Sequence, residues 1–546
     1  MSNVLGLHFG HDSGAAVVKD GKLVSSISSE RLSRIKKDRT ISKEVIDYVL
    51  KESNLKAKDI DAIALSHYED DKFDILEVFF NDIRLDFLET DLIGSYRVGK
   101  AKLLGNNFVP IYELPHHFGH GPSAYYMSNF EEAIVLTVDA CSPNYQPYNS
   151  QIALGMKNKF IYQEDAKTMI SQLYNAFTAS LGIGHPVFKA GSTMGLAAYG
   201  KPLEEVVKNK NYYVENMHKE GNVLEYSVDL FSRLSGKTSK VTANNLIEAS
   251  FYQEMPAKEK LMHTKLGRDL AATAQFIFEE SMIHTVKTYV EPHGIKNLCM
   301  AGGSVLNCNA NSRIKELGIF DNIFIYPAAG DDGLAAGNAL YVAHNVLGEK
   351  RSKYSDREVA YTGKDYRSKT FINHKKIAQH IADGKIVAWF IGASENGPRA
   401  LGHRSLLADP RDFNKREILN FIVKKREWFR PFAPSVLEEE AHKWFSPGDP
   451  SPFMLYTQKV LKPELVPAIT HVDGTARIQT VSKEMDKDYY QVIKEFYNIT
   501  GVPMVINTSF NSDGEPIVES EEDALNSFKN NDGIDVLVLN GKIYEK

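Results

Sequence analysis

Two histidines four positions apart, His116 and His120, are the side chains best spaced to hold a metal ion. On a helix, residues four apart share one face, which brings two imidazoles to one ion. The segment Ser123–Met127 is typical of a helix, so the pair should lie at its start, with Pro122 in the first turn. His117 lies between them and should point elsewhere. Chance histidines on a surface helix give the same spacing, so the pair alone leaves that alternative open.

Two further segments could add carboxylates to this pair. Asp139 ends a predicted buried strand over 132–139, and Asp331 and Asp332 stand in the glycine-flanked loop 330–333. Imidazoles combined with carboxylates form a mixed nitrogen and oxygen site that suits iron, zinc or manganese better than calcium or magnesium. The alternative is that Asp331 and Asp332 form a turn or cap the helix that should follow at Leu334.

A short polar loop, Gly10-His11-Asp12-Ser13-Gly14, separates the first two predicted strands. Its small residues would let backbone N–H groups approach a phosphate closely. The Asp12 carboxylate could hold a cation, orient water or take a proton. An ordinary hairpin turn has the same composition, so the loop alone does not decide between the two.

Two glycine-rich segments have the composition of nucleotide-binding segments. They are Lys189–Gly200 and Ala301–Asn307. Glycine in such positions also allows close backbone packing, so neither segment is specific alone.

Basic residues gather in two segments of the last third of the chain. Arg399 and Arg404 lie in the glycine-rich stretch 395–405, and a predicted helix over 414–423 leads to Lys424-Lys425-Arg426 and Arg430. Arginine binds phosphate oxygens with two parallel hydrogen bonds, and lysine adds a point charge. If these groups converge, with the polar stretch Asn507–Asn511, they would bind a small, highly charged anion.

The basic segments have two other interpretations. Basic runs are usually solvated faces. Aromatic residues interleaved with arginine, here Trp428, Phe429 and Phe432, can also stack on single-stranded RNA.

The elements that must position these residues are mixed. We expect strands over 4–9, 15–18, 22–24, 132–139, 298–301 and 385–390, and a helix over 270–292. This mixture predicts an α/β architecture. The polar segment 347–370, few of whose residues should be buried, is the best linker. It places a boundary near residue 365, giving domains 1–365 and 366–546.

Bulk properties exclude several classes of protein. A chain of 546 residues is too long for one core, which predicts two or three domains. With 64 basic and 70 acidic residues, the net charge of -6 gives no reason to expect a nucleic-acid partner. No stretch has the roughly 18–20 apolar residues that cross a bilayer, so no membrane partner is expected. The start does not read as a signal peptide, and three cysteines are too few for a disulfide framework, so we expect a cytoplasmic protein.

Taken together and in this order, the motifs resemble one family. It is the O-carbamoyltransferases of the nodulation-factor, tobramycin, novobiocin and cephamycin type. The matching segments are 10–14, 116–120, 194–200, 301–307 and 330–333, followed by Gly-Pro-Arg-Ala-Leu-Gly at 397–402, Lys-x-Arg-Glu-x-x-Arg-Pro-x-Ala-Pro at 424–434 and Asn-Thr-Ser-Phe-Asn at 507–511.

The resemblance implies an actin/hexokinase-like ATPase domain over 1–365. It implies that His116, His120, Asp331 and Asp139 hold a divalent metal, iron first and zinc or manganese otherwise. Asp139 also falls where the family has a carboxylate near metal and phosphate. His11 and Asp12 should face the transfer site, with Asp12 as general base for the acceptor hydroxyl. We expect the nucleotide contacts in this half to include Gly302, Gly303 and Asn307.

For 366–546 the resemblance implies a YrdC-like α/β domain that makes carbamoyl adenylate. The implied contacts to carbamoyl phosphate and nucleotide are Arg399, Arg404, Lys424, Arg426, Arg430, Arg477, Asn507 and Ser509. ATP would be the co-substrate, with magnesium as its companion ion left open.

The chain departs from the family pattern at one phosphate loop. The family reads Val-Asp-Gly-x-Gly-Glu there, and this chain reads Val138-Asp139-Ala140-Cys141-Ser142-Pro143. Loss of both glycines removes backbone freedom around that phosphate, which bears on the pose of ATP and on activity.

The function that follows is transfer of a carbamoyl group from carbamoyl phosphate, through carbamoyl adenylate, to a hydroxyl of a small molecule in natural-product biosynthesis. Three rivals stay open. They are a threonylcarbamoyl-type tRNA-modifying enzyme, a nucleotide-binding protein with impaired catalysis, and an actin-like small-molecule kinase. The acceptor, the metal and the oligomeric state are left open by the sequence.

Overall fold

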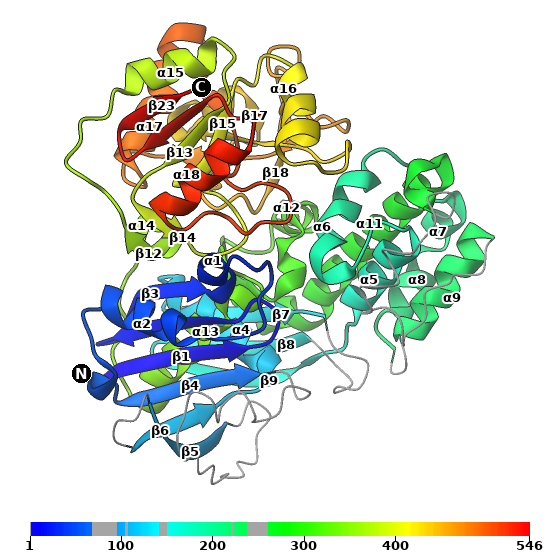
Figure 1. Ribbon diagram of the computed structural model, residues 1–546. Helices are drawn as coiled ribbons and strands as arrows, with labels where there is room; N and C mark the ends of the chain where they lie inside the picture. The colour runs from blue at the N-terminus through cyan, green and yellow to red at the C-terminus, as the bar shows by residue number, and fades with distance from the viewer. Residues whose placement is uncertain (1, 68–95, 104–107, 141–149, 220–222, 237–259) are drawn as a thin grey trace.

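The computed structural model describes residues 2–67, 96–103, 108–140, 150–219, 223–236 and 260–546. In Figure 1 the C-terminal half, yellow to red, lies above two sheets of the N-terminal half, and a helical lobe, teal to green, projects to one side.

The first sheet is built around the N-terminal strand. Its order is β3-β2-β1-β4-β6-β5. Asp20 and Gly21 both have positive φ and join two antiparallel strands in a hairpin. The strands are β1 (Asn3–Phe9), β2 (Gly14–Lys19), β3 (Lys22–Ser28), β4 (Ala62–His67), β5 (Arg97–Lys102) and β6 (Phe108–Glu113).

The second sheet repeats the plan of the first. Its order is β11-β10-β7-β8-β9. In both sheets the first three strands in sequence pair antiparallel. In the first sheet β4 and β6 run parallel to β1, and β5 is antiparallel to β6. In the second sheet β10 and β11 run parallel to β7. Its strands are β7 (Glu132–Val138), β8 (Ser150–Met156), β9 (Lys159–Ala166), β10 (Asn297–Ala301) and β11 (Asn322–Ile325). This duplicated topology is that of the actin/hexokinase-like fold expected for the N-terminal half.

Two helices, α4 (His116–Met127) and α13 (Leu334–Tyr341), cross in direct contact between the sheets. A Cβ on Gly337 would lie 2.2 Å from the carbonyl oxygen of Gly119, so only glycine permits this approach. The crossing brings the start of α4 close to η7 (Asp331–Gly333), the short helix that precedes α13.

The start of α4 differs in one detail from the prediction. The helix does begin at His116, but Pro122 then lies in its second turn rather than the first. Proline removes one helix hydrogen bond. The helix continues because its residues are buried on nearly all sides, including Tyr125 and Tyr126 at 0% exposure.

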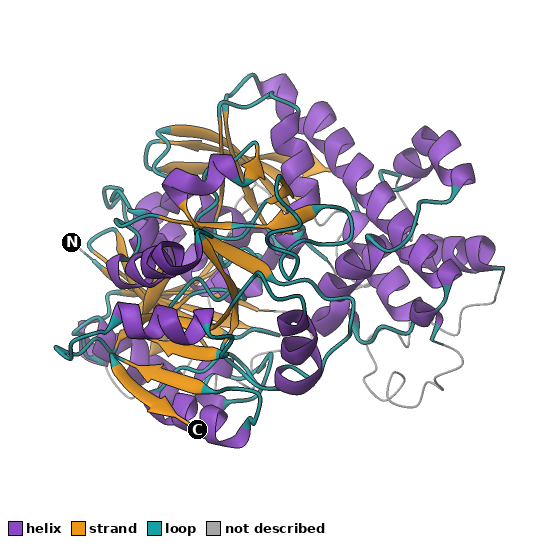
Figure 2. Cartoon of the chain, turned by 90° about the horizontal axis from the view of Figure 1, so that it is seen from above, coloured by secondary structure: helices purple, strands orange, loops and turns teal. Residues whose placement is uncertain are grey.

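The helical lobe carries the predicted helix 270–292 and the glycine-rich segment 189–200. The first corresponds to α11, and most of the second forms the C-terminal part of α6. Seen from above, the lobe packs beside the sheets (Figure 2). Its helices are α5 (Ile170–Ser180), α6 (Pro186–Ala197), α7 (Glu204–Lys208), α8 (Lys210–Asn216), α9 (Val223–Ser235) and α11 (Lys265–Thr285).

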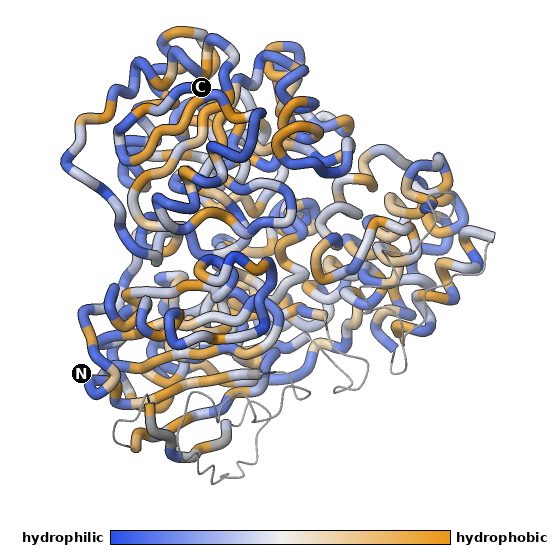
Figure 3. Tube along the Cα trace, in the orientation of Figure 1, coloured by the Kyte–Doolittle hydropathy of each residue, from blue (hydrophilic) through white to orange (hydrophobic). Residues whose placement is uncertain are grey.

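The C-terminal half contains a mixed sheet of seven strands, in the order β20-β16-β21-β15-β13-β22-β23. Its buried strands form the apolar core visible in Figure 3. The strands are β13 (Val387–Phe390), β15 (Arg404–Ala408), β16 (Ala433–Leu437), β20 (Gln479–Val481), β21 (Met504–Ser509), β22 (Val536–Leu539) and β23 (Lys542–Glu545). Helices α15 (His374–Ala382), α17 (Lys487–Thr500) and α18 (Glu521–Asn530) pack on it, and α16 (Asn414–Glu417) continues as η9 (Ile418–Val423).

The segment 347–370 is more ordered than a linker. It contains α14 (Asp356–Ala360) and β12 (Tyr361–Asp365), which pairs with β14 (Ala393–Glu395). As expected, few of its residues are buried, and these are Tyr354, Val359, Ala360, Tyr361 and Thr362. These buried side chains are scattered among charged ones, so composition alone does not predict which residues of the segment are buried.

These features confirm the α/β fold class, with an actin/hexokinase-like N-terminal half and an α/β C-terminal half as expected of a YrdC-like domain. No helix in the described part of the chain has the length and apolar character needed to cross a membrane. Cys299 and Cys308 are buried free thiols, and Cys141 lies outside the described residues.

Candidate active site

Two histidines and two aspartates meet where α4, β7 and η7 converge. The imidazole Nε2 of His120 lies 2.8 Å from Asp139 Oδ2 and 3.5 Å from Asp331 Oδ1. His116 Nε2 lies 3.7 and 3.5 Å from the same two oxygens. One ligand atom from each of the four residues falls within 4.8 Å of all the others. The structure therefore brings together all four residues expected to bind metal.

The donor set fits a divalent transition metal. Two carboxylates this close and this buried require positive charge between them. Burial alone would lower the pKa of His116, but attraction to Asp331 and Asp139 raises it to about 9. Burial alone would raise the pKa of Asp139, but His120 and His116 hold it well below its usual range. A mixed set of two imidazoles and two carboxylates suits iron, zinc or manganese.

His11 and Asp12 lie beside this cluster, on the loop between β1 and β2. His11 Nδ1 lies 3.2 Å from Asp331 Oδ2 and 3.1 Å from Asp12 Oδ2. Asp12 is also ion-paired with Lys37. Burial alone would raise the pKa of Asp12, but Lys37 and His11 outweigh it and lower the pKa. The carboxylate therefore stays ionised.

A cavity of about 390 Å³ extends from this cluster into the helical lobe. Gly303 and Asn307, two of the expected nucleotide contacts, line it, and so do Asp12 and Asp331. The Gly303 N–H donates to Asp139 Oδ1 at 3.0 Å, which joins the glycine segment to the cluster. Gly302 lies behind the cavity rather than in its lining. Its φ is +92°, and a Cβ would lie 2.3 Å from the Val138 carbonyl oxygen, so Gly302 shapes the turn.

Asn307 is held in place by its neighbours on the lobe. Its side-chain amide exchanges hydrogen bonds with Gln275, both at 3.1 Å, and Gln275 also accepts from the Tyr174 hydroxyl at 2.7 Å. Tyr174 lines the same cavity. This network fixes polar groups on the side of the cavity formed by the helical lobe.

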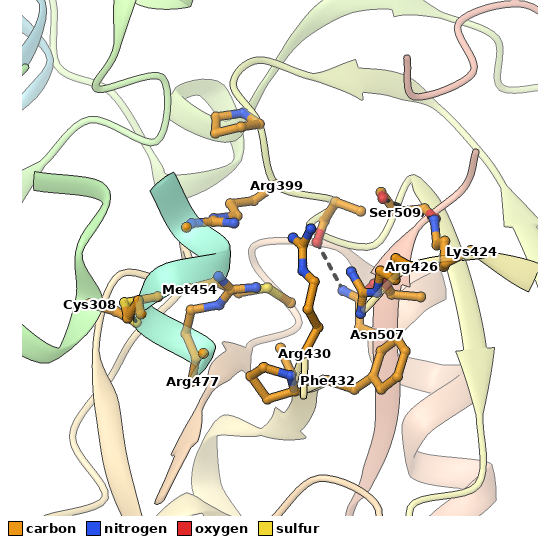
Figure 4. A pocket seen from close by; sticks show the side chains of 18 of the residues that line it. Cys308, Arg399, Lys424, Arg426, Arg430, Phe432, Met454, Arg477, Asn507 and Ser509 are labelled. Carbon is orange, nitrogen blue, oxygen red and sulfur yellow. Dashed lines mark hydrogen bonds between the residues drawn. The ribbon is translucent and has the colours of Figure 1, made fainter. Parts of the chain in front are cut away.

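A second cavity, of about 470 Å³, collects the predicted cations. Figure 4 shows the guanidinium groups of Arg399, Arg430 and Arg477 turned toward a common space. They come from the loop 396–403, the loop after η9, and β19 (Thr475–Arg477). Seven of the eight residues expected to bind carbamoyl phosphate and nucleotide line this cavity, namely Arg399, Lys424, Arg426, Arg430, Arg477, Asn507 and Ser509.

These cations destabilise one another in the absence of an anion. Burial and then repulsion by Arg477 lower the pKa of Arg399 to about 9. Burial and repulsion by Arg430 lower the pKa of Arg426 well below its usual value. Desolvated like charges of this kind are relieved by a polyanion that accepts several hydrogen bonds at once. The arrangement therefore has the charge and the donors to bind a polyanion.

Lys424 organises the cavity wall rather than pointing freely into it. Its ammonium donates to Asn511 Oδ1 at 2.6 Å and to the Asn511 carbonyl at 2.9 Å, and it also contacts Ser509. Asn507 is similarly engaged, donating to the Ala400 carbonyl at 3.1 Å. Both residues tie the end of β21 to the loops that carry the arginines.

Arg404 requires a correction. It is fully buried and lines neither cavity. Its guanidinium donates to the backbone carbonyls of Ile391 (2.8 Å) and Gly392 (3.1 Å) and stacks 3.8 Å from the Phe390 ring. Its place next to the functional loop made it look like a ligand contact, but β15 begins at Arg404 and turns its side chain into the sheet core.

The two cavities share a wall. Both are lined by Arg399 and Arg430 from the C-terminal half and by Phe188, Gly191 and Met194 from α6. The arginine cavity and the histidine-aspartate cluster are therefore connected through residues of both halves of the chain.

Sequence reasoning missed several charged residues at these cavities. Lys36 lines both, Lys37 pairs with Asp12, and Lys189 on α6 forms an ion pair with Glu427 across the two halves. The run Ile35-Lys36-Lys37-Asp38-Arg39 was the available signal for the first two. Its link to Asp12 depends on the return of the chain after α1 (Ser29–Ser33).

The comparisons with known proteins agree with this geometry. Residues 3–340 match the family described as the carbamoyltransferase N-terminus, and residues 378–546 match the carbamoyltransferase C-terminus. The chain belongs to the carbamoyltransferase family.

Two nodulation proteins of Sinorhizobium fredii are among its relatives. Nodulation protein NolNO is 34% identical over 98% of this chain and 79% of its own length. Nodulation protein U is 28% identical over 94% of each chain. This carbamoyltransferase is accordingly an enzyme of the transferase class.

Solved structures resemble the chain more distantly. Full-length HypF in a phosphate- and nucleotide-bound form matches 63% of this chain and 56% of its own, with a TM-score of 0.34 and 12% identity. Component A of the Acidaminococcus fermentans (R)-2-hydroxyglutaryl-CoA dehydratase matches 62% and 97%, with a TM-score of 0.31 and 14% identity. At these scores the likenesses carry no argument about the site.

Proposed function

We propose that this carbamoyltransferase activates carbamoyl phosphate with ATP and transfers the carbamoyl group to a hydroxyl of a small molecule. The observation that carries the proposal is the pair of adjoining cavities, one rich in arginine and the other ending at the histidine-aspartate cluster. The boundary near residue 365 would separate the histidine-aspartate cluster from the loops that carry the arginines.

The first stage would take place among the arginines. Water cleaves the bond between the carbamate oxygen and phosphorus, giving phosphate and carbamate. A carbamate oxygen then attacks the α-phosphorus of ATP, and pyrophosphate leaves, giving carbamoyl adenylate. Arg399, Arg430 and Arg477 would bind the phosphate oxygens and stabilise the charge on the leaving groups. Lys424 would hold the wall formed by Ser509 and Asn511.

The second stage would take place at the cluster in the N-terminal half. The acceptor oxygen attacks the carbamoyl carbon, its proton is lost, and AMP leaves. Asp12, ionised and held by Lys37, is the candidate to take that proton, and His11 would orient it. Carbamate itself is a poor acyl donor, whereas AMP is a good leaving group, which is why activation precedes transfer.

A divalent ion held by His116, His120, Asp139 and Asp331 would supply Lewis-acid polarisation of a carbamoyl or phosphate oxygen at this end of the cavity. The chemistry of the donor set favours iron, zinc or manganese. Gly303 and Asn307 would contact the nucleotide beside it.

The shared wall supports a handover inside the protein. A mixed anhydride hydrolyses readily in water, so an enclosed route between the cavities would protect it. Arg399 and Arg430 line both cavities and could follow the phosphate group from one to the other.

The test begins without any acceptor. The purified protein is mixed with carbamoyl phosphate and ATP, and phosphate, pyrophosphate and AMP are measured by ion-exchange chromatography. Pyrophosphate formation that depends on carbamoyl phosphate is expected. If ATP binds but no pyrophosphate forms under any condition, the adenylate route is wrong and a binding protein with impaired catalysis becomes the better reading. ADP formation instead would indicate a kinase.

The acceptor is sought separately. Sugars, aminoglycosides, macrocycles and guanidine-containing natural products are incubated with both substrates, and mass spectrometry detects a gain of one carbamoyl group. A tRNA mobility-shift assay tests the threonylcarbamoyl alternative, for which we expect no complex.

A further inference from the structure

The shared wall between the cavities contains a gap where a side chain is missing. Phe188, Gly191 and Met194 are spaced three residues apart on α6, so they lie along one face of the helix. All three line both cavities, and Arg399 and Arg430 face the same space from the C-terminal half. Gly191 is the middle residue of this face.

Gly191 is unlike the other helical glycines in the described residues. A Cβ on Gly119 would lie 2.6 Å from Asn338, on Gly267 1.8 Å from the Leu261 carbonyl, and on Gly337 2.2 Å from the Gly119 carbonyl. These glycines allow close packing. A Cβ on Gly191 would meet no atom within 4 Å, so packing does not require glycine there.

Backbone conformation does not require glycine at this position either. Gly191 lies in the body of α6 and is absent from the residues with positive φ. Glycine in a helix interior is less stable than alanine. Gly191 therefore lowers the stability of α6 without improving a local contact. The open volume beside it is the one feature that its lack of a side chain provides.

Neighbouring positions on α6 place the gap at the junction. Ala190 lines only the cavity that ends at the histidine-aspartate cluster, and Gly195 lines only the arginine cavity. Gly195 is also close to Pro431, with a distance of 3.4 Å for its Cβ position. Gly191 lies between these two positions and borders both spaces.

We propose that Gly191 lies at the passage between the two cavities of this carbamoyltransferase. Because Gly191 has no side chain, the passage has room for the activated intermediate to move from one cavity to the other. The inference rests on the two-stage function proposed above and adds the residue that sets the width of the route. A side chain at 191 would narrow the route from the α6 side, and its Cβ would lie more than 4 Å from the guanidinium groups of Arg399 and Arg430.

The experiment compares wild type, Gly191→Ala and Gly191→Leu, with Lys208→Leu as control. Lys208 lies on α7 of the same lobe, its side chain is 70% exposed, and it lines neither cavity. Each protein is mixed with carbamoyl phosphate and ATP without acceptor. Pyrophosphate release is measured first. Carbamoyl adenylate that stays with the protein through rapid gel filtration is then measured after acid quenching.

We expect Gly191→Leu to release pyrophosphate at the wild-type rate, within about a factor of two. It should retain about tenfold less carbamoyl adenylate, because an intermediate that stays in the arginine cavity is hydrolysed by water. Gly191→Ala should fall between the two, and Lys208→Leu should match wild type. The thermal unfolding midpoint of Gly191→Ala should equal or exceed that of wild type, since its added Cβ meets no atom within 4 Å.

Three results are distinguishable from the expected one. If Gly191→Leu retains adenylate at the wild-type level, the proposed role of Gly191 is wrong. If pyrophosphate release by Gly191→Leu falls as much as adenylate retention, the proposed role is also wrong, because the glycine then makes room for the substrates of the first stage. If the wild-type protein forms no pyrophosphate, the proposed function is wrong, and the proposed role of Gly191 fails with it.

Discussion

Asp12 is ion-paired with Lys37, although the two residues lie on different loops. Both have backbone angles in the left-handed region, with φ of 64° and 54°. This conformation is costly for residues other than glycine, asparagine and aspartate, and it clusters at functional sites. The pairing accounts for the low pKa of Asp12, so Lys37 sets the protonation state of the expected general base.

Replacement of Lys37 by Met should move the pH dependence of carbamoyl transfer. The pKa of Asp12 is lowered in the folded protein, and loss of Lys37 should raise it. Since the ionised carboxylate is the active form, activity should disappear at a higher pH as the pH falls. The measurement is the pH profile of kcat/KM with an acceptor found by the screen, and Lys37→Arg should restore the wild-type profile. An unchanged acidic limb would show that Asp12 is not the base.

Arg399→Ala and Arg430→Ala should each slow pyrophosphate formation by roughly 10- to 100-fold, because hydrogen bonds to charged groups contribute about 1.5–3 kcal/mol each. Arg411 is the matched control. It pairs with Asp409 outside both cavities, and Arg411→Ala should keep the rate. Stopped-time assays of pyrophosphate provide the comparison. Equal losses in all three variants would argue for a general effect of removing arginine.

Arg404 should behave differently from those arginines. Because it bonds to the carbonyls of Ile391 and Gly392 in the sheet core, Arg404→Leu should lower stability by about 1–3 kcal/mol for each carbonyl left unsatisfied. Urea unfolding measures this loss. A variant with unchanged stability and a raised KM for carbamoyl phosphate would restore Arg404 to the binding site.

The metal cluster predicts a stoichiometry as well as an activity. The purified protein should contain about one transition-metal ion per chain, and His120→Ala should reduce that content severely. His117→Gln, on the same helix but outside the cluster, is the control. Elemental analysis by mass spectrometry is the measurement. Chelation should lower transfer to the acceptor more than it lowers pyrophosphate formation, and equal losses would contradict the assignment of the two stages to two cavities.

Asp486 should anchor the segment that joins the two halves. Its buried carboxylate pairs with Arg357 at 2.9 Å and His403 at 3.0 Å and also contacts Arg367. Removing one partner of a buried ion pair costs about 3–5 kcal/mol, so Asp486→Asn should destabilise the protein by that amount. Asp488→Asn is the control, since that side chain is 27% exposed.

The same carboxylate gives a pH dependence. Burial alone would raise the pKa of Asp486, but His403 and Arg367 hold it far below its usual value. Its stabilising effect is therefore present above pH about 4, the pKa of an unfolded aspartate, and is lost as the pH falls below it. Urea unfolding of wild type and Asp486→Asn should converge at low pH. A constant difference down to pH about 2 would contradict this cause.

Local patterns were sufficient to predict the strands around Gly10 and Asp20, the strand that ends before Asp139, and the start of α4 at His116. Apolar periodicity and glycine position determine these features over a few residues. The four metal ligands were also expected to meet, although His116 and Asp331 are far apart in the sequence, because the family motifs carried that information.

Other features depend on contacts that no local pattern contains. Arg399 and Arg404 look alike in their loop, and only the direction of β15 separates a cavity residue from a core residue. The buried residues of 347–370 are covered by elements from both halves of the chain. The pairing of Lys37 with Asp12 likewise follows from the path of the chain after α1, which sequence spacing does not reveal.

The two sheets of the N-terminal half follow the same plan, and each carries an aspartate within three residues of the end of its first strand. Asp12 follows β1 and Asp139 follows β7. One carboxylate of the reaction centre therefore comes from each copy of the repeat. A rotation of one copy against the other would change the separation of these two groups, so the angle between the copies would itself set whether the centre is assembled.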